Sequence, residues 1–200
     1  MQIKTTRRTH QERTDSTKAS LVTAARRLFN EKGYANTGTP EIVEAAQVTR
    51  GALYHHFTDK ADLFHAVALQ CAQEVADSVD TAPDDPDRPV DALVRGAQAY
   101  FDAMSQEGRA RLLLLEAPSV LTVEQRLQIS ELSGEKELQK GLAEALPAAL
   151  AAAVSLPELT SLVSAAFDRA ALEIATGGSQ KDYKTAMQFM LSQLVRQPDK

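Results

Sequence analysis

Residues 49–57 combine a guanidinium, a phenol and two imidazoles in one short stretch, TRGALYHHF. The fork of Arg50 can bond the two acceptors of a guanine edge, and Gly51 lets the backbone approach bases or a thymine methyl group. Tyr54 and His55 lie on other faces of the same predicted helix, from which they can reach phosphates. This chemistry is typical of contacts with duplex DNA.

Two further polar residues flank this stretch. Lys60 stands at the start of a predicted helix, where an ammonium group and free backbone amides together make a phosphate site. Thr37 offers a hydroxyl to a second phosphate from the loop before the preceding helix. Leu53 and Phe57 are one helical turn apart, so we expect both to pack inward.

Metal binding and catalysis find little support in the residue pattern. His55 and His56 diverge by about 100° on a helix, and no acidic or cysteine partner stands at ligand spacing, so we expect no metal and no cofactor. The chain has no HxxxH, no ExxH and no nucleophile motif beside a histidine, so we expect no enzyme. Cys71 is interpreted as a small buried hydrophobic residue. An all-α enzyme stays the less favoured alternative.

A helix-turn-helix is the arrangement that positions residues 49–57 for the major groove. Apolar spacing predicts a first helix from a cap at Asp15 or Ser16 to Gly33, which ends it. The second helix is predicted to start with Thr39 as N-cap, followed by proline, and the third with Thr49 as N-cap.

The rest of the chain also has helical periodicity. Asp59 is predicted to cap a fourth helix that runs to about Val79, with Asp62 in the position of a capping-box acid. The proline-rich stretch 81–89 is the clearest internal boundary. The pattern indicates an all-α fold of about nine helices, the later ones at roughly 90–106, 109–116, 122–146, 157–176 and 179–196, with a break at Pro147.

Composition and charge agree with a two-part chain. The chain has 200 residues, of which 44% are hydrophobic and 24% charged, and its formal net charge is −5. Residues 1–60 carry ten Lys and Arg against six Asp and Glu, whereas residues 61–200 carry twelve against twenty-one. Since residues 1–60 are net basic and residues 61–200 are net acidic, we expect only residues 1–60 to contact a polyanion. No apolar run has the length of a membrane span, the start has no signal-like apolar region, and the single cysteine indicates a cytoplasmic protein.

The run from Gly33 to Phe64, which ends in AAQVTRGALYHHFTDKADLF, resembles the DNA-binding domain of the TetR (tetracycline-repressor) family of transcriptional regulators. The resemblance covers about residues 15–64. It implies a flexible basic arm at 1–14, a helix-turn-helix domain at 15–60 and a ligand-binding and dimerisation domain at 61–200. The segment RLLLLEAPSVL at 111–121 also resembles ligand-domain sequences of the family, less specifically. The DNA-binding residues that we predict are Thr37, Thr39, Thr49, Arg50, Gly51, Tyr54, His55 and Lys60.

Three positions depart from the family pattern. Gly38 stands where a threonine or serine usually caps the second helix, so we expect Thr39 to take over the cap. Gln47 replaces the glycine of the turn, and a residue with a side chain at positive φ costs roughly 1 kcal/mol there. Val43 replaces a small alanine at the helix crossing, which widens the packing. These departures affect contact details and leave the domain assignment intact.

The resemblance further implies a homodimer that binds a palindromic operator and is released by a small-molecule effector, in most cases as a repressor. The Ala/Leu-rich interior indicates an apolar or amphipathic effector. An architectural DNA-binding protein without an effector is the other alternative. The predicted pocket residues are Tyr100, Phe101, Met104, Leu113, Glu116, Phe167 and Arg169. The predicted dimer-interface residues are Leu159, Leu162, Val163, Ala166, Ala170, Tyr183, Met187, Met190, Leu191 and Leu194.

Overall fold

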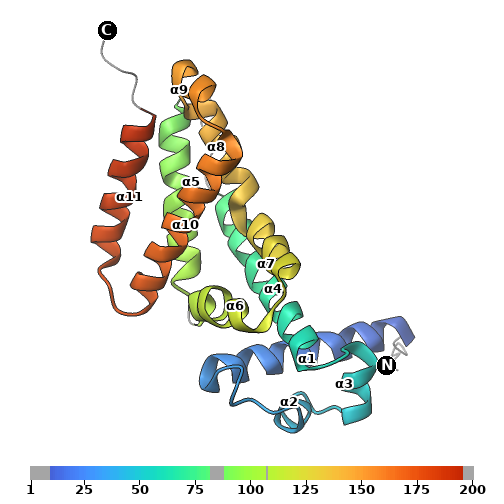
Figure 1. Ribbon diagram of the computed structural model, residues 1–200. Helices are drawn as coiled ribbons and strands as arrows, with labels where there is room; N and C mark the ends of the chain where they lie inside the picture. The colour runs from blue at the N-terminus through green and yellow to red at the C-terminus, as the bar shows by residue number, and fades with distance from the viewer. Residues whose placement is uncertain (1–9, 82–87, 107, 196–200) are drawn as a thin grey trace, which may run out of the picture. The chain divides into compact units, whose positions relative to one another are not determined.

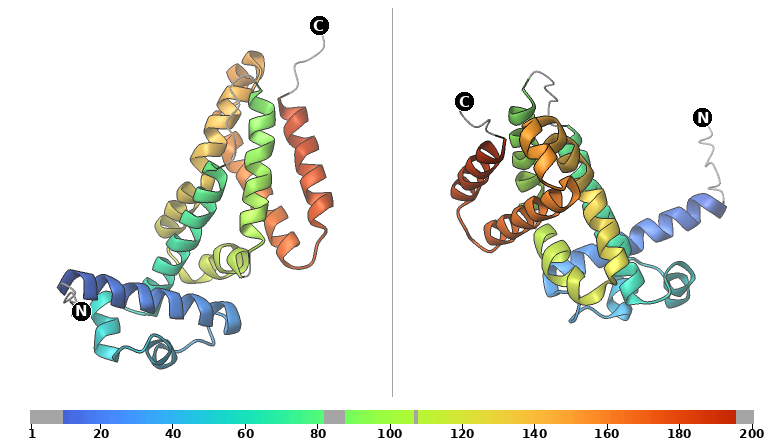
Figure 2. Two further views of the ribbon diagram at one scale, coloured as in Figure 1. Left: turned by 180° about the vertical axis from the view of Figure 1, so that it is seen from behind. Right: turned by 45° about the horizontal axis from the view of Figure 1, so that its top comes forward.

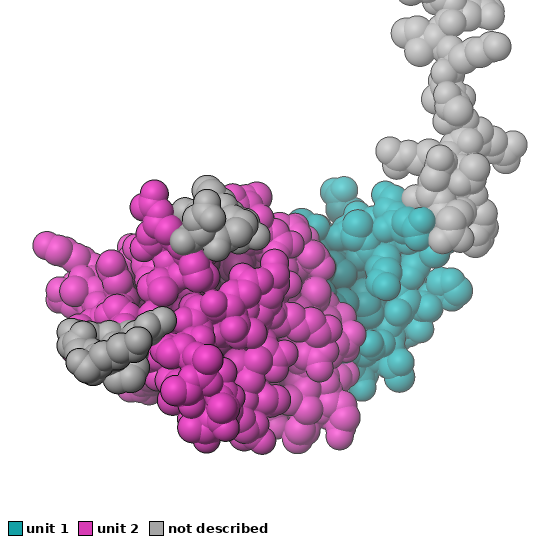
Figure 3. Space-filling model, turned by 90° about the horizontal axis from the view of Figure 1, so that it is seen from above, with its two compact units in different colours: residues 1–67 teal, residues 68–200 magenta. Residues whose placement is uncertain are grey.

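Helices account for nearly all of the regular structure, as the periodicity predicts. The computed structural model describes residues 10–81, 88–106 and 108–195, and these residues contain no strand (Figure 1). The chain divides between Val67 and Ala68 into two units, which Figure 3 colours separately. The division lies inside one helix, after the predicted boundary at residue 60. Each unit is described below by itself.

Unit 1 begins with helix α1 (His10–Lys32). This helix starts before the predicted caps Asp15 and Ser16, because residues 10–14 contain neither glycine nor proline to stop it. Residues 1–9 of the predicted basic arm lie outside the described residues. At the other end, Gly33 adopts a φ of 82° and its N–H donates to the carbonyl of Phe29 at 2.8 Å, as the prediction of a glycine end requires.

Helix α2 (Thr39–Ala45) starts differently from the prediction. Gly38 is the N-cap in an extended conformation and makes no side-chain cap bond, so Thr39 is the first helical residue rather than the cap. Glycine is tolerated at this position because its small size lets water reach the free amides. The side chain of Thr39 is thereby left available for another partner.

The turn and the next two helix starts agree with the sequence. Gln47 has a φ of 56°, the positive value expected for a residue that replaces glycine. Helix α3 (Arg50–His56) is capped by Thr49, whose hydroxyl oxygen accepts from the N–H of Ala52 at 3.1 Å. Before helix α4 (Lys60–Asp80), the Asp59 carboxylate accepts from the N–H of Asp62 at 2.8 Å.

An aromatic cluster forms the centre of unit 1. The ring of Phe29 lies 5.3 Å from that of Phe64, and the ring of Tyr34 lies 5.1 Å from Phe64 in an edge-on arrangement. Leu53 and Phe57 are buried, as their spacing predicts. The hydrophobic face of α3 is thereby fixed against the core, and the opposite face stays in solvent.

Lys60 ties the loop between α1 and α2 to the start of α4. Its ammonium donates to the carbonyl of Tyr34 at 2.9 Å and to the carbonyl of Thr37 at 3.0 Å. The same nitrogen lies 4.1 Å from the centroid of the Tyr34 ring. Three attractions therefore act on one half-buried ammonium, and they hold the residues that lead into α2.

Unit 2 contains the rest of α4 and the helices that follow. They are α5 (Pro89–Met104), the π-helical η1 (Arg111–Glu116), α6 (Ala117–Val120), α7 (Val123–Ser130), the π-helical η2 (Glu131–Glu135), α8 (Lys136–Ala145), α9 (Ala148–Ala153), α10 (Leu156–Ala175) and α11 (Gln180–Leu194). The ends of α4 and α5 agree with the predicted loop, of which residues 82–87 lie outside the described residues. Pro147 separates α8 from α9, as predicted.

The predicted single helix at 122–146 is wrong, because η2 interrupts it. Gly134 has a φ of 115° and Ser133 lies outside the helical region, so the chain changes direction there. A glycine inside a helical pattern is compatible with either outcome, and sequence periodicity alone does not distinguish them. This break, together with short α6 and α9, gives more helices than the nine expected.

Helices α10 and α11 form the antiparallel hairpin that the glycines at 177–178 predict (Figure 2). Gly177 adopts a φ of 106° in the connection. Helix α11 also packs against α5, where the Lys184 ammonium donates to the Asp102 carboxylate at 2.7 Å. A second link in unit 2 joins Arg109 to Glu74 at 2.5 Å, with most of the arginine side chain buried.

Replacing Lys60 by Met tests the tie to the loop. Methionine keeps an apolar stem of similar length but leaves the carbonyls of Tyr34 and Thr37 without the ammonium. We expect unit 1 to lose about 1.5–3 kcal/mol of unfolding free energy, the contribution of hydrogen bonds to a charged group. Urea denaturation, with hydrogen exchange of the amides in residues 33–38, measures the loss.

Lys32→Met is the matched control in the same unit. Lys32 makes an exposed ion pair with Glu41, and such pairs contribute less than ~1 kcal/mol. Equal effects of the two substitutions would show that Lys60 behaves as an ordinary surface lysine.

Candidate functional site

The exposed face of α3 carries the residues predicted to contact DNA. Arg50, Gly51, Tyr54 and His55 are all exposed, while the other side of this short helix is buried through Leu53. Arg50 and Gly51 occupy the first turn, which is the part of a recognition helix that meets base edges. The structure therefore presents these four predicted residues on one accessible surface.

Thr39, Arg50 and Tyr54 form a cluster that joins α2 to α3. The Arg50 guanidinium lies 5.5 Å from the centroid of the Tyr54 ring. A hydrogen bond with the Thr39 side chain, and then one with Arg50, lowers the pKa of the Tyr54 phenol from its usual value of 10.0. The side chains of Thr39, Arg50 and Tyr54 are therefore close enough to affect one another electrostatically.

The two histidines have different surroundings. The His55 side chain is exposed, whereas His56 is half-buried and its ring centroid lies 5.3 Å from that of His55. Burial, then the charges of His55 and Lys18, lower the pKa of His56, and Asp15 opposes this shift. The neutral form of His56 is therefore favoured relative to a free imidazole, and His55 is the more exposed of the two side chains. Within the described ranges, no three His, Cys, Asp or Glu residues are grouped as a metal would require.

One predicted phosphate contact, Thr37, needs correction, and a second, Lys60, is partly engaged within the fold. Thr37 is only 1% exposed, and its hydroxyl donates to the carbonyls of Gly33 at 2.8 Å and Leu28 at 3.3 Å. It closes the end of α1 rather than facing solvent. Lys60 uses two of its three N–H donors to bond carbonyls of the same loop. Both side chains are types that suit phosphate contact and internal bonding equally well, and the fold uses them internally.

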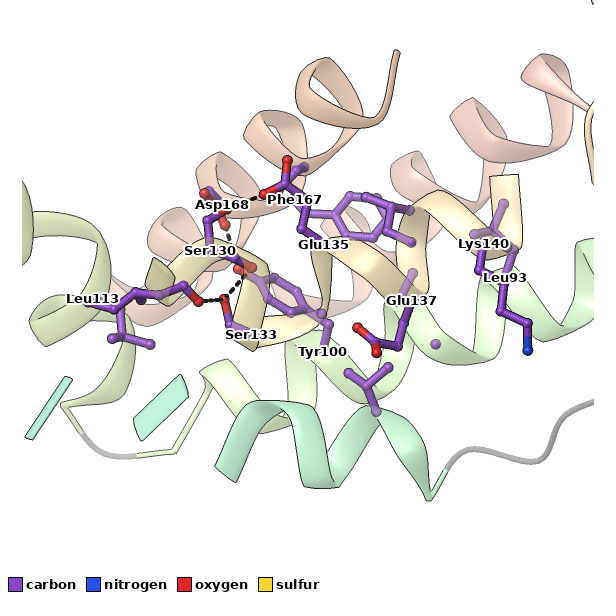
Figure 4. Close-up of a pocket in the computed structure, with 18 of the residues that line it drawn as sticks. Leu93, Tyr100, Leu113, Ser130, Ser133, Glu135, Glu137, Lys140, Phe167 and Asp168 are labelled. Atoms are coloured by element: carbon purple, nitrogen blue, oxygen red, sulfur yellow. Dashed lines mark hydrogen bonds between the residues drawn. The ribbon is translucent and has the colours of Figure 1, made fainter. Parts of the chain in front are cut away.

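Unit 2 encloses a cavity of about 580 Å³ (Figure 4). Its walls come from the end of α4 and from α5, η1, α6, α7, η2, α8 and α10. Tyr100, Leu113 and Phe167, three of the seven predicted pocket residues, line it. Pockets of this size, with mostly apolar walls and a few polar groups, hold small organic molecules.

Four predicted pocket residues do not line the cavity. Phe101 and Met104 are almost fully buried and serve as core, with the ring of Phe101 5.6 Å from that of Phe167. Glu116 binds Arg111 at 3.0 Å, and the exposed Arg169 pairs with Glu173 one turn along α10. Helix position alone does not decide which side of a helix faces a cavity and which faces the core.

Asp168 is one of the pocket residues that the sequence analysis missed. Its carboxylate accepts a hydrogen bond from the Tyr100 hydroxyl at 2.5 Å, between α10 and α5. Burial, and then Asp168, hold the pKa of Tyr100 well above 10.0. The available signal was an acidic residue directly after an aromatic one in the middle of a mostly apolar helix.

The predicted dimer stripe is divided between core and surface. Val163, Ala170, Met187 and Leu191 are buried within unit 2, so they pack against their own chain. The residues Leu159, Ala166, Tyr183, Met190 and Leu194 are half-buried. Leu162 stays 71% exposed, and Phe189, which the sequence analysis did not select, is 66% exposed. The hairpin therefore carries large apolar side chains on its outer face as well as its inner one.

Comparison with known proteins identifies both units. Residues 21–67 match the family model of the bacterial regulatory proteins, tetR family, and residues 90–198 match the model of the tetracyclin repressor-like C-terminal domain.

In the described residues, no helix combines the length and the apolar character needed to cross a bilayer.

Similar proteins fall in the same group. The HTH-type transcriptional regulator TtgR of Pseudomonas putida is 35% identical over 107 residues, which are 52% of this chain and 50% of that protein. The Tn10 TetC protein of Escherichia coli is 52% identical over 60 residues, 30% of each chain. The matches thus span half or less of these curated relatives.

Solved structures extend the similarity to the full length. A TetR-family transcriptional regulator from Pectobacterium atrosepticum is 27% identical, with a TM-score of 0.67 over 96% of this chain and all of the other. A putative TetR-family regulator from Syntrophomonas wolfei, 15% identical, has the same fold with a TM-score of 0.73 over 90% of this chain and 95% of the other. With a family model matched over more than half of its residues, the chain belongs to the TetR family of bacterial regulatory proteins.

Proposed function

We propose that the chain is a ligand-responsive transcriptional repressor of the cytoplasm, which binds a palindromic operator as a homodimer and is released by a small molecule. The observation that carries the proposal is the exposed first turn of α3, where Arg50 and Gly51 lie in solvent and the Arg50 guanidinium lies over the ring of Tyr54. A helix face of this kind fits the major groove, and family membership supports the same use.

On the operator, Arg50 would bond the O6 and N7 acceptors of a guanine, with Gly51 against a neighbouring base. Tyr54 and His55 would contact phosphates on either side. Thr39 would fix the phenol, and Thr49 would contribute from the N-terminus of α3. Lys60 would reach a phosphate only with its third N–H donor, because the other two are bonded to carbonyls of the loop. Gel-shift measurements with the intact chain, on inverted repeats upstream of its own reading frame, test the proposal.

The homodimer is proposed to form through the outer face of α10 and α11. Leu162 and Phe189 are large apolar side chains left in solvent on this hairpin, and burial in a partner would remove them from water. A two-fold arrangement would place two α3 helices about one turn of DNA apart, roughly 34–36 Å.

The cavity of unit 2 is proposed to hold the effector. A ligand releases DNA only if it binds the released conformer more tightly than the DNA-bound one. Helix α4 is the element that would transmit the change of conformation from the cavity to the DNA-binding residues. Its first residue, Lys60, holds the loop before α2, and its last residues, Val79 and Asp80, line the cavity.

Arg50→Ala is expected to weaken binding to the specific duplex by about 1–3 kcal/mol and to relax the preference for one base pair. The cause is the loss of a bidentate contact to a guanine. Fluorescence anisotropy with the inverted repeat and a scrambled duplex, at fixed salt, measures both effects. Arg27→Ala is the matched control, since Arg27 pairs with Glu31 on α1 and lies outside the α3 face. An unchanged affinity for Arg50→Ala would contradict the proposed contact.

Replacing both Leu162 and Phe189 by Glu is expected to give a monomer in sedimentation at micromolar concentration. Charges buried in an apolar interface without partners oppose association. Binding to the palindrome should fall as well. Leu115→Glu is the control, because Leu115 is also a large exposed apolar side chain but lies on η1, outside the hairpin. A double variant that still sediments as a dimer would place the interface elsewhere.

A further inference from the structure

The charged residues that line the cavity are mostly acidic. Among the described residues, the apolar walls are accompanied by five carboxylates, from Asp80, Glu135, Glu137, Glu144 and Asp168, and by two cations, Arg126 and Lys140. The positively and negatively charged side chains differ in how deeply they are buried. Arg126 and Lys140 are exposed, and Lys140 already pairs with Glu144 at 3.9 Å. Asp168 and Glu135 are half-buried, so the charges least screened by water are negative.

Asp168 and Glu135 make hydrogen bonds with neutral partners. The Tyr100 hydroxyl donates to Asp168 at 2.5 Å, and the Ser130 hydroxyl donates to Glu135 at 2.7 Å (Figure 4). In the described part of the chain, neither carboxylate has a lysine or arginine nitrogen within salt-bridge distance. Hydroxyl donors orient the carboxylates but leave their negative charge uncompensated.

The two carboxylates also act on each other. Burial raises the pKa of Asp168, the hydrogen bond from Tyr100 opposes this, and the nearby charge of Glu135 raises it further. Two acids from η2 and α10 that repel each other at the wall of a cavity store an unfavourable interaction. A positive charge placed between them would remove the repulsion and gain two attractions.

Aromatic rings complete the surroundings of such a charge. Tyr100 and Phe167 both line the cavity, and their ring centroids are 6.0 Å apart. The faces of aromatic rings attract organic cations, most strongly where water is excluded. Leu93 and Leu113 extend the apolar wall to either side, so one ligand can meet a charge site and an apolar site together.

We propose that the effector bound in this cavity is a lipophilic cation, an organic ammonium whose charge lies at Asp168 and Glu135 and whose apolar body lies along Leu93, Leu113 and Phe167. The inference rests on the proposed use of the cavity as an effector site, and it specifies the chemical class of that effector. Neutral and anionic amphipaths of the same length are the alternatives that the experiment distinguishes.

Isothermal titration calorimetry of the full chain with decyltrimethylammonium, decanol and decanoate, each below its micelle concentration, tests the class. We expect the ammonium compound to bind about tenfold or more tightly than decanoate and more tightly than decanol. Equal affinities, or a preference for decanoate, would overturn the cation assignment while leaving an effector cavity in place. Absence of binding by all three would overturn both the cation assignment and the proposed cavity.

Two isosteric variants locate the charge site. Asp168→Asn keeps an acceptor for Tyr100, and Glu135→Gln keeps one for Ser130, so each removes the charge with little change in shape. We expect each to weaken decyltrimethylammonium binding about tenfold while decanol binding is unchanged. Glu173→Gln is the control, since it removes a negative charge from the same helix α10 outside the cavity. If neither cavity variant discriminates between the cation and decanol, the assignment of the charge site is wrong.

Operator binding separates this inference from the regulator proposal. Without ligand, the Asp168→Asn and Glu135→Gln variants should bind the operator as the unsubstituted chain does, and decyltrimethylammonium should release it less readily from both. A chain that binds no operator would contradict the regulator proposal alone, because the calorimetric preference does not depend on DNA.

Discussion

The proposed DNA-binding surface is built on a loop in which two carbonyl oxygens accept hydrogen bonds from the Lys60 ammonium. Those carbonyls, of Tyr34 and Thr37, belong to the loop that delivers the chain to α2. The loop sets where α2 starts, and the start of α2 places Thr39 beside Tyr54. Since Thr37 closes the end of α1 from inside the same loop, one small set of internal polar bonds defines the outer face that the proposed function uses. Burying polar groups in this way stabilises only because every one of them is bonded.

The sequence alone predicts the backbone of unit 1 well. Thr49, Gln47 and Asp59 each act as predicted, because caps and turns are decided by residues close in the chain. It predicts less well what a polar side chain does when it has two suitable uses. The Thr37 hydroxyl and the Lys60 ammonium suit a phosphate or a carbonyl equally, and only the tertiary arrangement shows that carbonyls are in reach.

The cavity was harder to predict because it is made by packing between distant segments. Periodicity identifies an apolar helix but does not tell the wall of a cavity from a core, as Tyr100 and its neighbour Phe101 illustrate. The acidic character of the wall also depends on the break at Gly134, since a continuous helix would carry Glu135 round to a different side. The residue that ends the regular helix is thus also the one that brings a second carboxylate toward Asp168.

The positive φ of Gln47 has a consequence for the angle between α2 and α3. A side chain in this conformation strains the native turn, but it also restricts the denatured chain more than glycine does. Since a side chain also allows fewer neighbouring backbone conformations than glycine, we expect the turn between the two helices to be stiffer than a glycine turn. On the proposed function, most of the entropy cost of aligning α3 would then be met at folding, before any duplex is bound.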